Sequence, residues 1–179
     1  VDPTNPCFAG GGSGALAEPT RKSLAAEMRF GGRTFFLVVN HLKSKRDDDS
    51  VFGATQPPVY KTEEQRICQA EAIGRFVSSI LERDRDAAIV VLGDMNEHEF
   101  RSPMRRLAEV SGLTNLIDRV PVEERYSFSF EGNLQILDHI LVSPSLLGAA
   151  EVDIVHVNAD RADAIAASDH DPVVVRIRP

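Results

Sequence analysis

One apolar segment constrains the fold more than any other feature of the chain. Residues 88–92 are aliphatic without a break, and such a run predicts a strand that is buried on both faces of a sheet. The strand continues through Gly93 into Asp94-Met95-Asn96. A buried carboxylate is costly without a partner. The pattern therefore indicates an α/β fold with a polar site at one edge of its sheet.

Asp94 and Asn96 are the first candidate site residues. Side chains alternate along an extended segment, so these two are expected to point to one side and Met95 to the other. An acid and an amide that converge can hold a polar group. The same residue types also end strands in Asx turns, and the motif alone leaves both interpretations open.

A second apolar strand is predicted over residues 36–40 and ends at His41. The cations Lys43, Lys45 and Arg46 follow it. An imidazole beside cations suits an anionic substrate, although a solvated loop explains the cations as well. The net charge of −7 disfavours tight non-specific binding of nucleic acid more than it disfavours catalysis.

Asp138 lies within residues 135–142, a strand that is otherwise mostly apolar. Its burial without a partner would cost several kcal/mol, so a cation, a metal or a histidine is expected to face it. His170, just before the apolar residues 172–177, is the natural candidate. A carboxylate fixes the tautomer of an imidazole and makes it a better base. A histidine taken alone at the start of a strand would be interpreted as structural.

Four motifs, taken in order, resemble those of the endonuclease/exonuclease/phosphatase superfamily with the DNase-I-like fold. They are Asn40-His41-Leu42-Lys43-Ser44-Lys45, Gly93-Asp94-Met95-Asn96, Leu137-Asp138-His139-Ile140-Leu141-Val142-Ser143 and Ser168-Asp169-His170-Asp171-Pro172-Val173. The resemblance covers residues 21–177 and is closest to secreted bacterial extracellular nucleases. It implies an α/β sandwich of mixed and antiparallel sheets flanked by helices.

The resemblance assigns the proton-transfer roles to three residues. His170 resembles the general base that activates the attacking water, and Asp138 resembles the carboxylate that orients this base. His41 is similar to the second active-site histidine, which acts near the scissile phosphate as an acid or an electrostatic stabiliser.

The resemblance also implies a divalent metal, with Mg²⁺ expected first and Mn²⁺ or Ca²⁺ as alternatives. Asp94 is expected to position the nucleophile and to bind the metal together with Asp169. Asn96 is expected to hydrogen-bond the phosphoryl oxygens as charge develops on them. A glutamate that is the principal metal ligand in complete family domains has no counterpart before Arg21.

Arg21, Lys43 and Lys45 are the expected phosphate-binding residues. Relatives carry a phosphate-contacting arginine where Arg21 stands, but they usually continue with proline rather than with Lys22-Ser23. We expect residues 1–19 to be a flexible lead-in and residues 20–179 to be the C-terminal portion of a family domain. The missing N-terminal part would then be a partner, and the isolated chain could be inactive.

The resulting functional hypothesis is a divalent-metal-dependent nuclease that hydrolyses DNA phosphodiester bonds by in-line attack of water. One alternative is a phosphomonoesterase or a lipid phosphodiesterase of the inositol-phosphate or sphingomyelin type. The other is an inactive fragment that serves as a binding module. A secreted location is expected from the resemblance, and no apolar run approaches the length of a membrane span.

Cys7 and Cys68 are the two cysteines. The count permits one disulfide or two buried thiols. The resemblance to secreted nucleases favours the disulfide, which would pin the glycine-rich N-terminal segment to the helix that carries Cys68.

The remaining pattern alternates strands and helices. The predicted helices cover residues 63–83, with a capping box formed by Thr62 and Gln65, and residues 102–110. The other predicted strands are 24–30, paired with 34–40 in a hairpin, and 126–130, 151–157 and 172–178. Residues 47–59 are expected to form a surface loop with a solvated acidic tip. The histidines His98, His139 and His156 are assigned no role.

Overall fold

A five-stranded mixed sheet forms the centre of the protein. The computed structural model describes residues 2, 4–10, 19–50, 53–161 and 165–178. The strand order is β1-β2-β3-β7-β4. The strands are β1 (Leu24–Phe30), β2 (Arg33–His41), β3 (Ala88–Asp94), β7 (Asp138–Val142) and β4 (Thr114–Asn115). Only β2 and β3 are parallel among these neighbours. The predicted mixed α/β class is confirmed.

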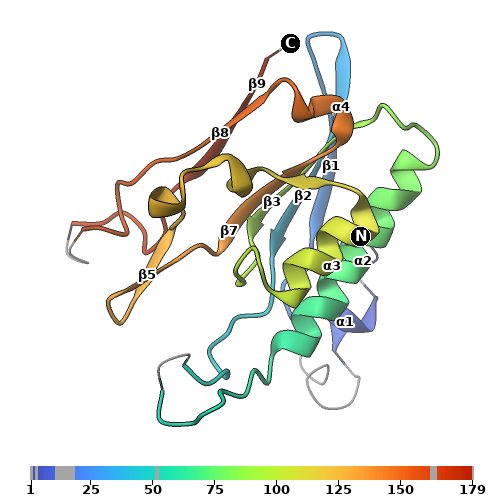
Figure 1. Cartoon of the computed structure of the whole chain (residues 1–179). Coiled ribbons are helices and arrows are strands. Elements are labelled where there is room, and N and C mark those ends of the chain that lie inside the picture. The colour runs from blue at the N-terminus through green and yellow to red at the C-terminus, as the bar shows by residue number, and fades with distance from the viewer. Residues whose placement is uncertain (1, 3, 11–18, 51–52, 162–164, 179) are drawn as a thin grey trace.

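Two helices cover one face of this sheet. They are α2 (Glu63–Leu81) and α3 (Ser102–Ser111), which lie side by side along the strands (Figure 1). Ile73 and Val77 of α2 belong to the same buried cluster as Ile89 and Val91 of β3. The apolar side chains of α2 therefore pack on the sheet, and the predicted helix over residues 63–83 is confirmed. No described helix is long and apolar enough to cross a membrane.

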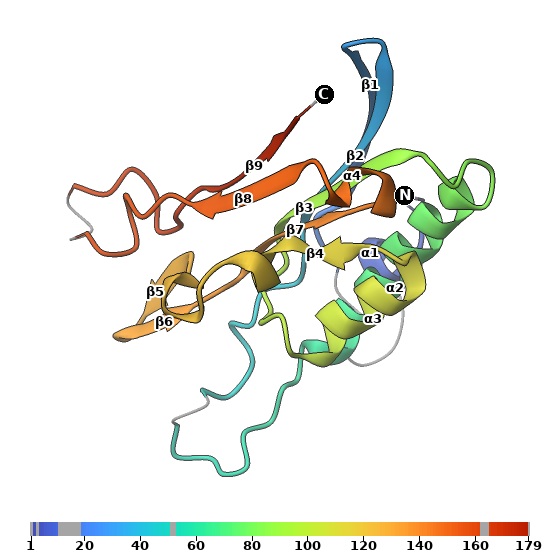
Figure 2. The ribbon, with the colours of Figure 1, turned by 45° about the horizontal axis from the view of Figure 1, so that its top comes forward.

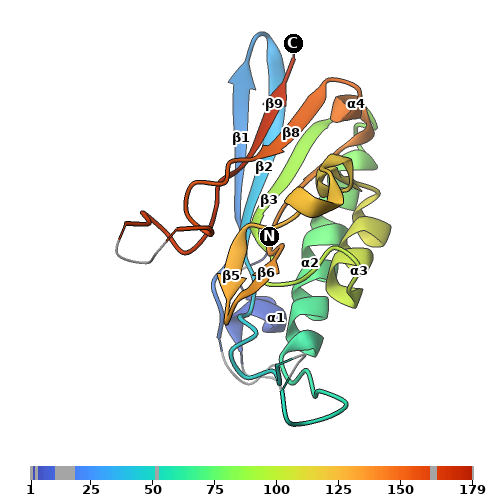
Figure 3. The same ribbon diagram turned by 60° about the vertical axis from the view of Figure 1, so that its left-hand side comes forward.

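The opposite face is covered by a two-stranded ribbon. It consists of β8 (Ala150–Ile154) and β9 (Val173–Ile177), which pair antiparallel, and it follows the short helix α4 (Pro144–Leu147). Val173 and Val175 pack against the buried cluster that contains Val90 and Val142. Figure 3 shows the ribbon and the helices on opposite sides of the central sheet. The result is an α/β sandwich.

The strand bounds differ from the prediction in several places. The turn at Gly31-Gly32 closes the β1–β2 hairpin with positive φ at both residues, which glycine adopts easily. This hairpin projects beyond the end of β3 (Figure 2). The predicted strand 135–142 is divided between β6 (Asn133–Gln135) and β7, and β6 pairs with β5 (Phe128–Phe130). Two 3₁₀ helices, η2 (Leu116–Arg119) and η3 (Val122–Glu124), precede this hairpin.

The expectation of a flexible lead-in over residues 1–19 is wrong for α1 (Pro6–Ala9). Phe8 is 1% exposed and belongs to the cluster beneath the helices. Asn5 caps α1 by accepting a hydrogen bond from the backbone N–H of Cys7. A buried aromatic side chain makes this segment part of the core, whereas the glycine-rich stretch over residues 11–18 lies outside the described residues.

Cys7 and Cys68 form a disulfide that ties α1 to α2, with a Cα–Cα distance of 5.5 Å. The linked residues are separated by 61 positions. A crosslink over a loop of this length stabilises the fold by about 4 kcal/mol through the entropy of the unfolded chain.

Replacing both cysteines by serine is therefore expected to lower the free energy of unfolding by about 2–5 kcal/mol. Urea denaturation of the oxidised wild type and of the double variant measures the loss. Reductant should destabilise the wild type and leave the double variant unchanged. Equal midpoints for the two proteins would contradict the prediction.

Candidate active site

The strand register places three predicted site residues in one row. His41 at the end of β2 pairs with Asp94 at the end of the parallel strand β3. Asp94 in turn pairs with Asp138, where the antiparallel strand β7 begins. Parallel strands end at the same edge of a sheet, and an antiparallel neighbour starts there. The row His41, Asp94, Asp138 is thus a direct product of the topology.

Asp94 and Asn96 converge, as predicted, but for a different reason. The strand ends at Asp94, and Asn96 has a positive φ of 50°, so a turn and not strand alternation brings them together. Asp94 Oδ1 accepts from the Asn96 backbone N–H at 2.8 Å, and Oδ2 accepts from Asn96 Nδ2 at 3.1 Å. Met95 is fully buried. The Asx turn itself brings the acid and the amide together, so the two interpretations of this motif do not exclude each other.

Asn96 also ties Asp94 to the neighbouring loop. Its Nδ2 donates to the carbonyl oxygen of Leu42 at 3.2 Å as well as to Asp94. Both amide protons are used in these bonds, so Asn96 holds the Asp94 carboxylate in place. Gly93, just before Asp94, permits a close approach of β3 to β2, because a Cβ at its position would lie 2.0 Å from the carbonyl oxygen of Asn40.

His41 faces Asp94, with 3.2 Å between Nε2 and Oδ2. Burial lowers the pKa of His41 below its ordinary value, although the charge of Asp94 opposes this shift. Burial raises the pKa of Asp94, against the opposing hydrogen bond from the backbone of Asn96. The low histidine pKa favours a neutral imidazole at His41.

The predicted pairing of Asp138 with His170 is confirmed. His170 Nδ1 lies 2.6 Å from Asp138 Oδ2, and the same oxygen accepts a hydrogen bond from Ser127 Oγ at 2.6 Å. Because an ionised carboxylate only accepts, Nδ1 carries the proton and Nε2 of the neutral ring can accept one. The hydrogen bond to Asp138 raises the pKa of His170 even though burial opposes it.

The raised pKa of His170 predicts that this residue's contribution to stability depends on pH in metal-free buffer. A group with a raised folded-state pKa stabilises the fold fully below its unfolded pKa, and this contribution disappears as the pH rises through the folded value. We expect the melting temperature of wild type to exceed that of His170→Gln by a few degrees more at about pH 6 than at about pH 8.5. A constant difference across this range, measured by calorimetry, would contradict the prediction.

Ser127 is a site residue that the sequence reasoning missed. It is fully buried, and its hydroxyl contacts Asp138 while its carbonyl oxygen accepts from the backbone N–H of Asp171 at 2.7 Å. It therefore links the start of β7, which carries Asp138, to the segment before β9, which carries His170. The only signal in the sequence is its place before β5, which is too common a position for serine to be diagnostic.

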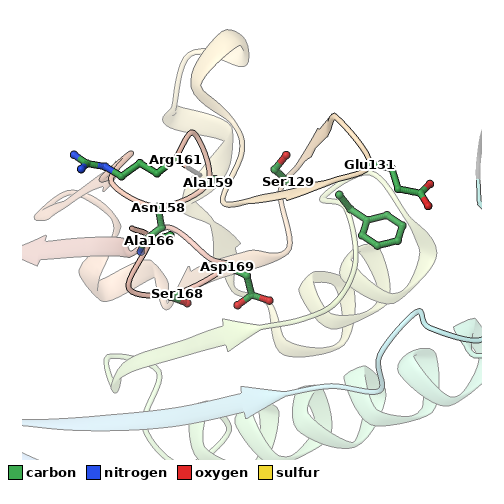
Figure 4. A pocket seen from close by; sticks show the side chains of 9 residues that line it. Ser129, Glu131, Asn158, Ala159, Arg161, Ala166, Ser168 and Asp169 are labelled. Carbon is green, nitrogen blue, oxygen red and sulfur yellow. The ribbon is translucent and has the colours of Figure 1, made fainter. Parts of the chain in front are cut away.

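Asp169, the predicted metal ligand beside His170, borders a cavity of about 300 Å³. Ser129, Asn158 and Ser168 also line it (Figure 4). Phe130 of the β5–β6 hairpin is a further lining residue. The described residues contain no group of three or more His, Cys, Asp and Glu side chains that could hold a metal ion. Asp94 and Asp169, the predicted metal ligands, therefore belong to no such group among the described residues.

The predicted phosphate-binding cations fall into two places. Arg21 and Lys43 line a cavity of about 460 Å³ together with Arg46. The charge of Arg21 contributes to the lowered pKa of His41, after the larger effects of burial and Asp94, so this cavity adjoins the site. Lys45 instead donates to Gln135 Oε1 at 3.0 Å, and burial lowers its pKa.

Arg66 of α2 is a second residue that the sequence reasoning missed. It is fully buried, and its guanidinium contacts Asp48 at 2.8 Å and Glu97 at 3.1 Å. The prediction of a solvated acidic tip is wrong for Asp48, which is buried in this ion pair. The predicted capping box is also wrong, because Thr62 makes no side-chain capping bond and its hydroxyl instead donates to Asp48.

This buried network holds two loops of the site. Glu97 directly follows Asn96, and its carbonyl oxygen lies 2.8 Å from Nε2 of His139. Nearby on α2, Gln69 Oε1 accepts from the backbone N–H of Lys43 at 3.0 Å. Helix α2 therefore fixes the loop after β2 and the loop after β3, in addition to packing on the sheet.

The other three histidines lie outside the His41–Asp94 and Asp138–His170 pairs. His139 is fully buried, as expected for a structural residue, and burial lowers its pKa to about 4. His98 stacks on Phe100, and burial lowers its pKa to about 4. His156, to which the sequence assigned no role, contacts the fourth motif, because its Nδ1 lies 3.0 Å from Asp171 Oδ2.

Several solved structures share this fold at low sequence identity. A 3′ phosphatase, NExo, from Neisseria bound to product DNA hairpin is 22% identical, with a TM-score of 0.60 over 90% of this chain and 66% of that one. Truncated TDP2 from Caenorhabditis elegans is 18% identical, with a TM-score of 0.61 over 84% and 57%. Sphingomyelinase C from Streptomyces griseocarneus is 16% identical, with a TM-score of 0.53 over 84% and 56%.

This chain spans between 56% and 66% of the length of these neighbours. A search of curated proteins returned no match. Residues 15–176 match the sequence profile of the Endonuclease/Exonuclease/phosphatase family, and this match includes all four motifs and the row of site residues. The chain belongs to the endonuclease/exonuclease/phosphatase family.

Proposed function

We propose that this protein hydrolyses phosphodiester bonds in DNA by in-line attack of water. The observation that carries the proposal is the Asp138–His170 pair beside the His41–Asp94 pair at one edge of the sheet. The Asp138–His170 pair offers a base, and the His41–Asp94 pair offers a neutral imidazole and a carboxylate. Both pairs come from the motifs that the family match covers.

In the proposed reaction His170 Nε2 takes a proton from the attacking water. The hydrogen bond to Asp138 keeps Nδ1 protonated and stabilises the imidazolium that forms. Asp94, held by Asn96, orients the water. His41 Nε2 lies 3.2 Å from Asp94 Oδ2, so the imidazole helps to hold this carboxylate beside the phosphate, and its lowered pKa favours the neutral ring for this task.

A divalent metal, with Mg²⁺ first, is part of the proposal. Carboxylate oxygens are the ligands that Mg²⁺ prefers, and the ion is commonly held by one or two carboxylates together with substrate phosphate. Asp94 and Asp169 have this chemistry. When bound, the metal would neutralise charge on the phosphoryl oxygens. We further propose that the rest of a family domain supplies additional ligands and is needed for full activity.

DNA is the proposed substrate on two grounds. The cavity lined by Arg21, Lys43 and Arg46 adjoins His41 and suits the phosphates that flank the scissile bond. Of the neighbours, NExo is a 3′ phosphatase whose structure contains product DNA. We also propose that the protein is secreted. The disulfide between Cys7 and Cys68 supports this location, because disulfides persist in oxidising compartments.

Lipid phosphodiester hydrolysis is the second candidate. Phe130 and Leu134 of the β5–β6 hairpin are each about half exposed, and Phe130 borders the cavity beside Asp169. An apolar rim of this kind suits a substrate with an apolar portion. A sphingomyelinase C is among the structures that share the fold.

Cleavage of supercoiled plasmid with Mg²⁺, Mn²⁺ or Ca²⁺ tests the proposal. The assay is run on this chain and on the natural full-length protein, each with a His170→Ala control. Parallel assays measure hydrolysis of sphingomyelin and release of phosphate from small phosphomonoesters. Metal-dependent nicking that His170→Ala abolishes supports the DNA nuclease, and turnover of a lipid or a phosphomonoester alone supports the alternative. No hydrolysis by either protein would overturn both.

A further inference from the structure

Asn158 lies behind the Asp138–His170 pair and contacts the backbone of His170. Its Nδ2 donates to the carbonyl oxygen of His170 at 2.7 Å. Its Oδ1 accepts from the backbone N–H of Ala167 at 3.2 Å. The side chain is almost completely buried, with the residue 8% exposed. The side-chain amide of Asn158 therefore bonds the segment before β9 at two points, Ala167 and His170.

Asp171 fixes the backbone of Asn158 in turn. Its Oδ1 accepts from the backbone N–H groups of Val157, Asn158 and Ala159 at 2.9, 2.7 and 3.1 Å. Its Oδ2 contacts His156, and the carboxylate is fully buried. A buried acid that accepts from three successive N–H groups orders this turn strongly. The amide of Asn158 is consequently presented to His170 in one orientation.

Hydrogen bonds from three sides hold the backbone around His170. The His170 N–H donates to Ser168 Oγ at 3.1 Å, and its carbonyl oxygen accepts from Asn158. The next N–H, that of Asp171, donates to the carbonyl oxygen of Ser127. Among these partners, only Asn158 belongs to the segment that directly follows β8. This backbone carries the imidazole whose Nδ1 lies 2.6 Å from Asp138 Oδ2.

We propose that Asn158 is a positioning residue that holds His170 in hydrogen-bonding contact with Asp138. It acts through the His170 backbone and does not touch the reacting atoms. The kinetic consequence rests on the proposed function of His170 as general base. The structural consequence is that the hydrogen bond from His170 Nδ1–H to Asp138 stays formed, and it does not rest on the proposed function.

The Asn158→Asp variant isolates the bond to His170. It preserves the shape of the side chain and the acceptor for Ala167 N–H, but it removes the donor and turns a carboxylate oxygen toward the His170 carbonyl. Displacing a catalytic group by about 1 Å can cost about 100-fold in rate, so we expect kcat to fall by about 10- to 100-fold with KM nearly unchanged. Asn133→Asp is the matched control, because Asn133 is exposed on β6 and bonds only within its own turn among the described contacts.

A double-mutant comparison separates positioning from a general loss of structure. In a His170→Ala background, Asn158→Asp should cause no further loss of activity, because the group that it positions is gone. An equal loss in both backgrounds would overturn the proposal. Asn158→Ser, which keeps the backbone bond to Asp171, serves if the aspartate variant does not fold. A folded serine variant with wild-type kcat would also overturn it.

Nuclear magnetic resonance supplies the readout that does not require activity. The Nδ1–H proton of His170 should be protected from solvent exchange in the wild type and in Asn133→Asp, and it should exchange at least about tenfold faster in Asn158→Asp. An unchanged resonance in the aspartate variant would overturn the positioning role. Failure of the wild type to hydrolyse any phosphoester would overturn the proposed function and leave this measurement valid.

Discussion

Replacing His170 by alanine is expected to lower kcat by about 10²- to 10⁴-fold, which is the range that a general base contributes. KM should change much less, because the ring acts on water and not on the substrate phosphate. Asp138→Asn should also reduce kcat strongly, since Nδ1 would lose the carboxylate that fixes its protonation. Steady-state kinetics of plasmid or oligonucleotide cleavage at saturating metal measures both effects.

His98→Ala is the matched control for this prediction. His98 is half-buried, stacks on Phe100 and carries no proposed role. Its replacement should leave kcat within about threefold of wild type, as expected for a histidine outside the chemistry. A His170→Ala protein that folds and retains wild-type kcat would exclude this residue as the base, and the assignment of the site would then be wrong.

Replacing Arg66 by alanine is expected to destabilise the protein by about 3–5 kcal/mol, because it leaves two buried carboxylates without their cation. For a chain of this size, the loss corresponds to a fall in melting temperature of about 6–20 °C. The loop that carries Asn96 adjoins Glu97, so activity should fall as well. Differential scanning calorimetry measures the stability change.

Two further variants identify the cause of this loss. Arg75→Ala, also on α2, removes an exposed arginine paired with Glu71 and should change the melting temperature little. Neutralising the partners of Arg66 should recover part of the lost stability, so the triple variant with Arg66→Met, Asp48→Asn and Glu97→Gln should melt above Arg66→Ala. If Arg66→Ala melted at the temperature of Arg75→Ala, the buried network would have no structural importance.

The sequence predicted the site residues better than it predicted their arrangement. Asp94, Asp138 and His170 could be found because each interrupts or ends an apolar strand, where an unpartnered polar group would be costly. Helix α2 could be found from its apolar period. The convergence of Asn96 on Asp94 was predicted from strand alternation, whereas the structure achieves it through a positive φ at Asn96 that no local pattern indicates.

Residues whose importance depends on distant contacts could not be found in this way. Arg66 is one of several charged residues on α2, and only its burial against Asp48 and Glu97 distinguishes it from Arg75. Asn158 and Ser127 are ordinary polar residues in connecting segments. Ser127 contacts Asp138, which is 11 positions away. Asn158 contacts Ala167 and His170, which are 9 and 12 positions away. Only the path of the chain brings these residues together.

The sequence by itself determined the strands, the main helices and the polar groups at the strand ends, because these follow from the periodic burial of apolar side chains and from the cost of burying a charge. Only the tertiary structure decided which polar groups meet. Sheet register aligned His41, Asp94 and Asp138. The segment that leads into β9 brought His170 to Asp138, the one pairing that the cost of a buried acid had already indicated. Pairings between strands depend on the topology of the whole sheet, which no single segment encodes.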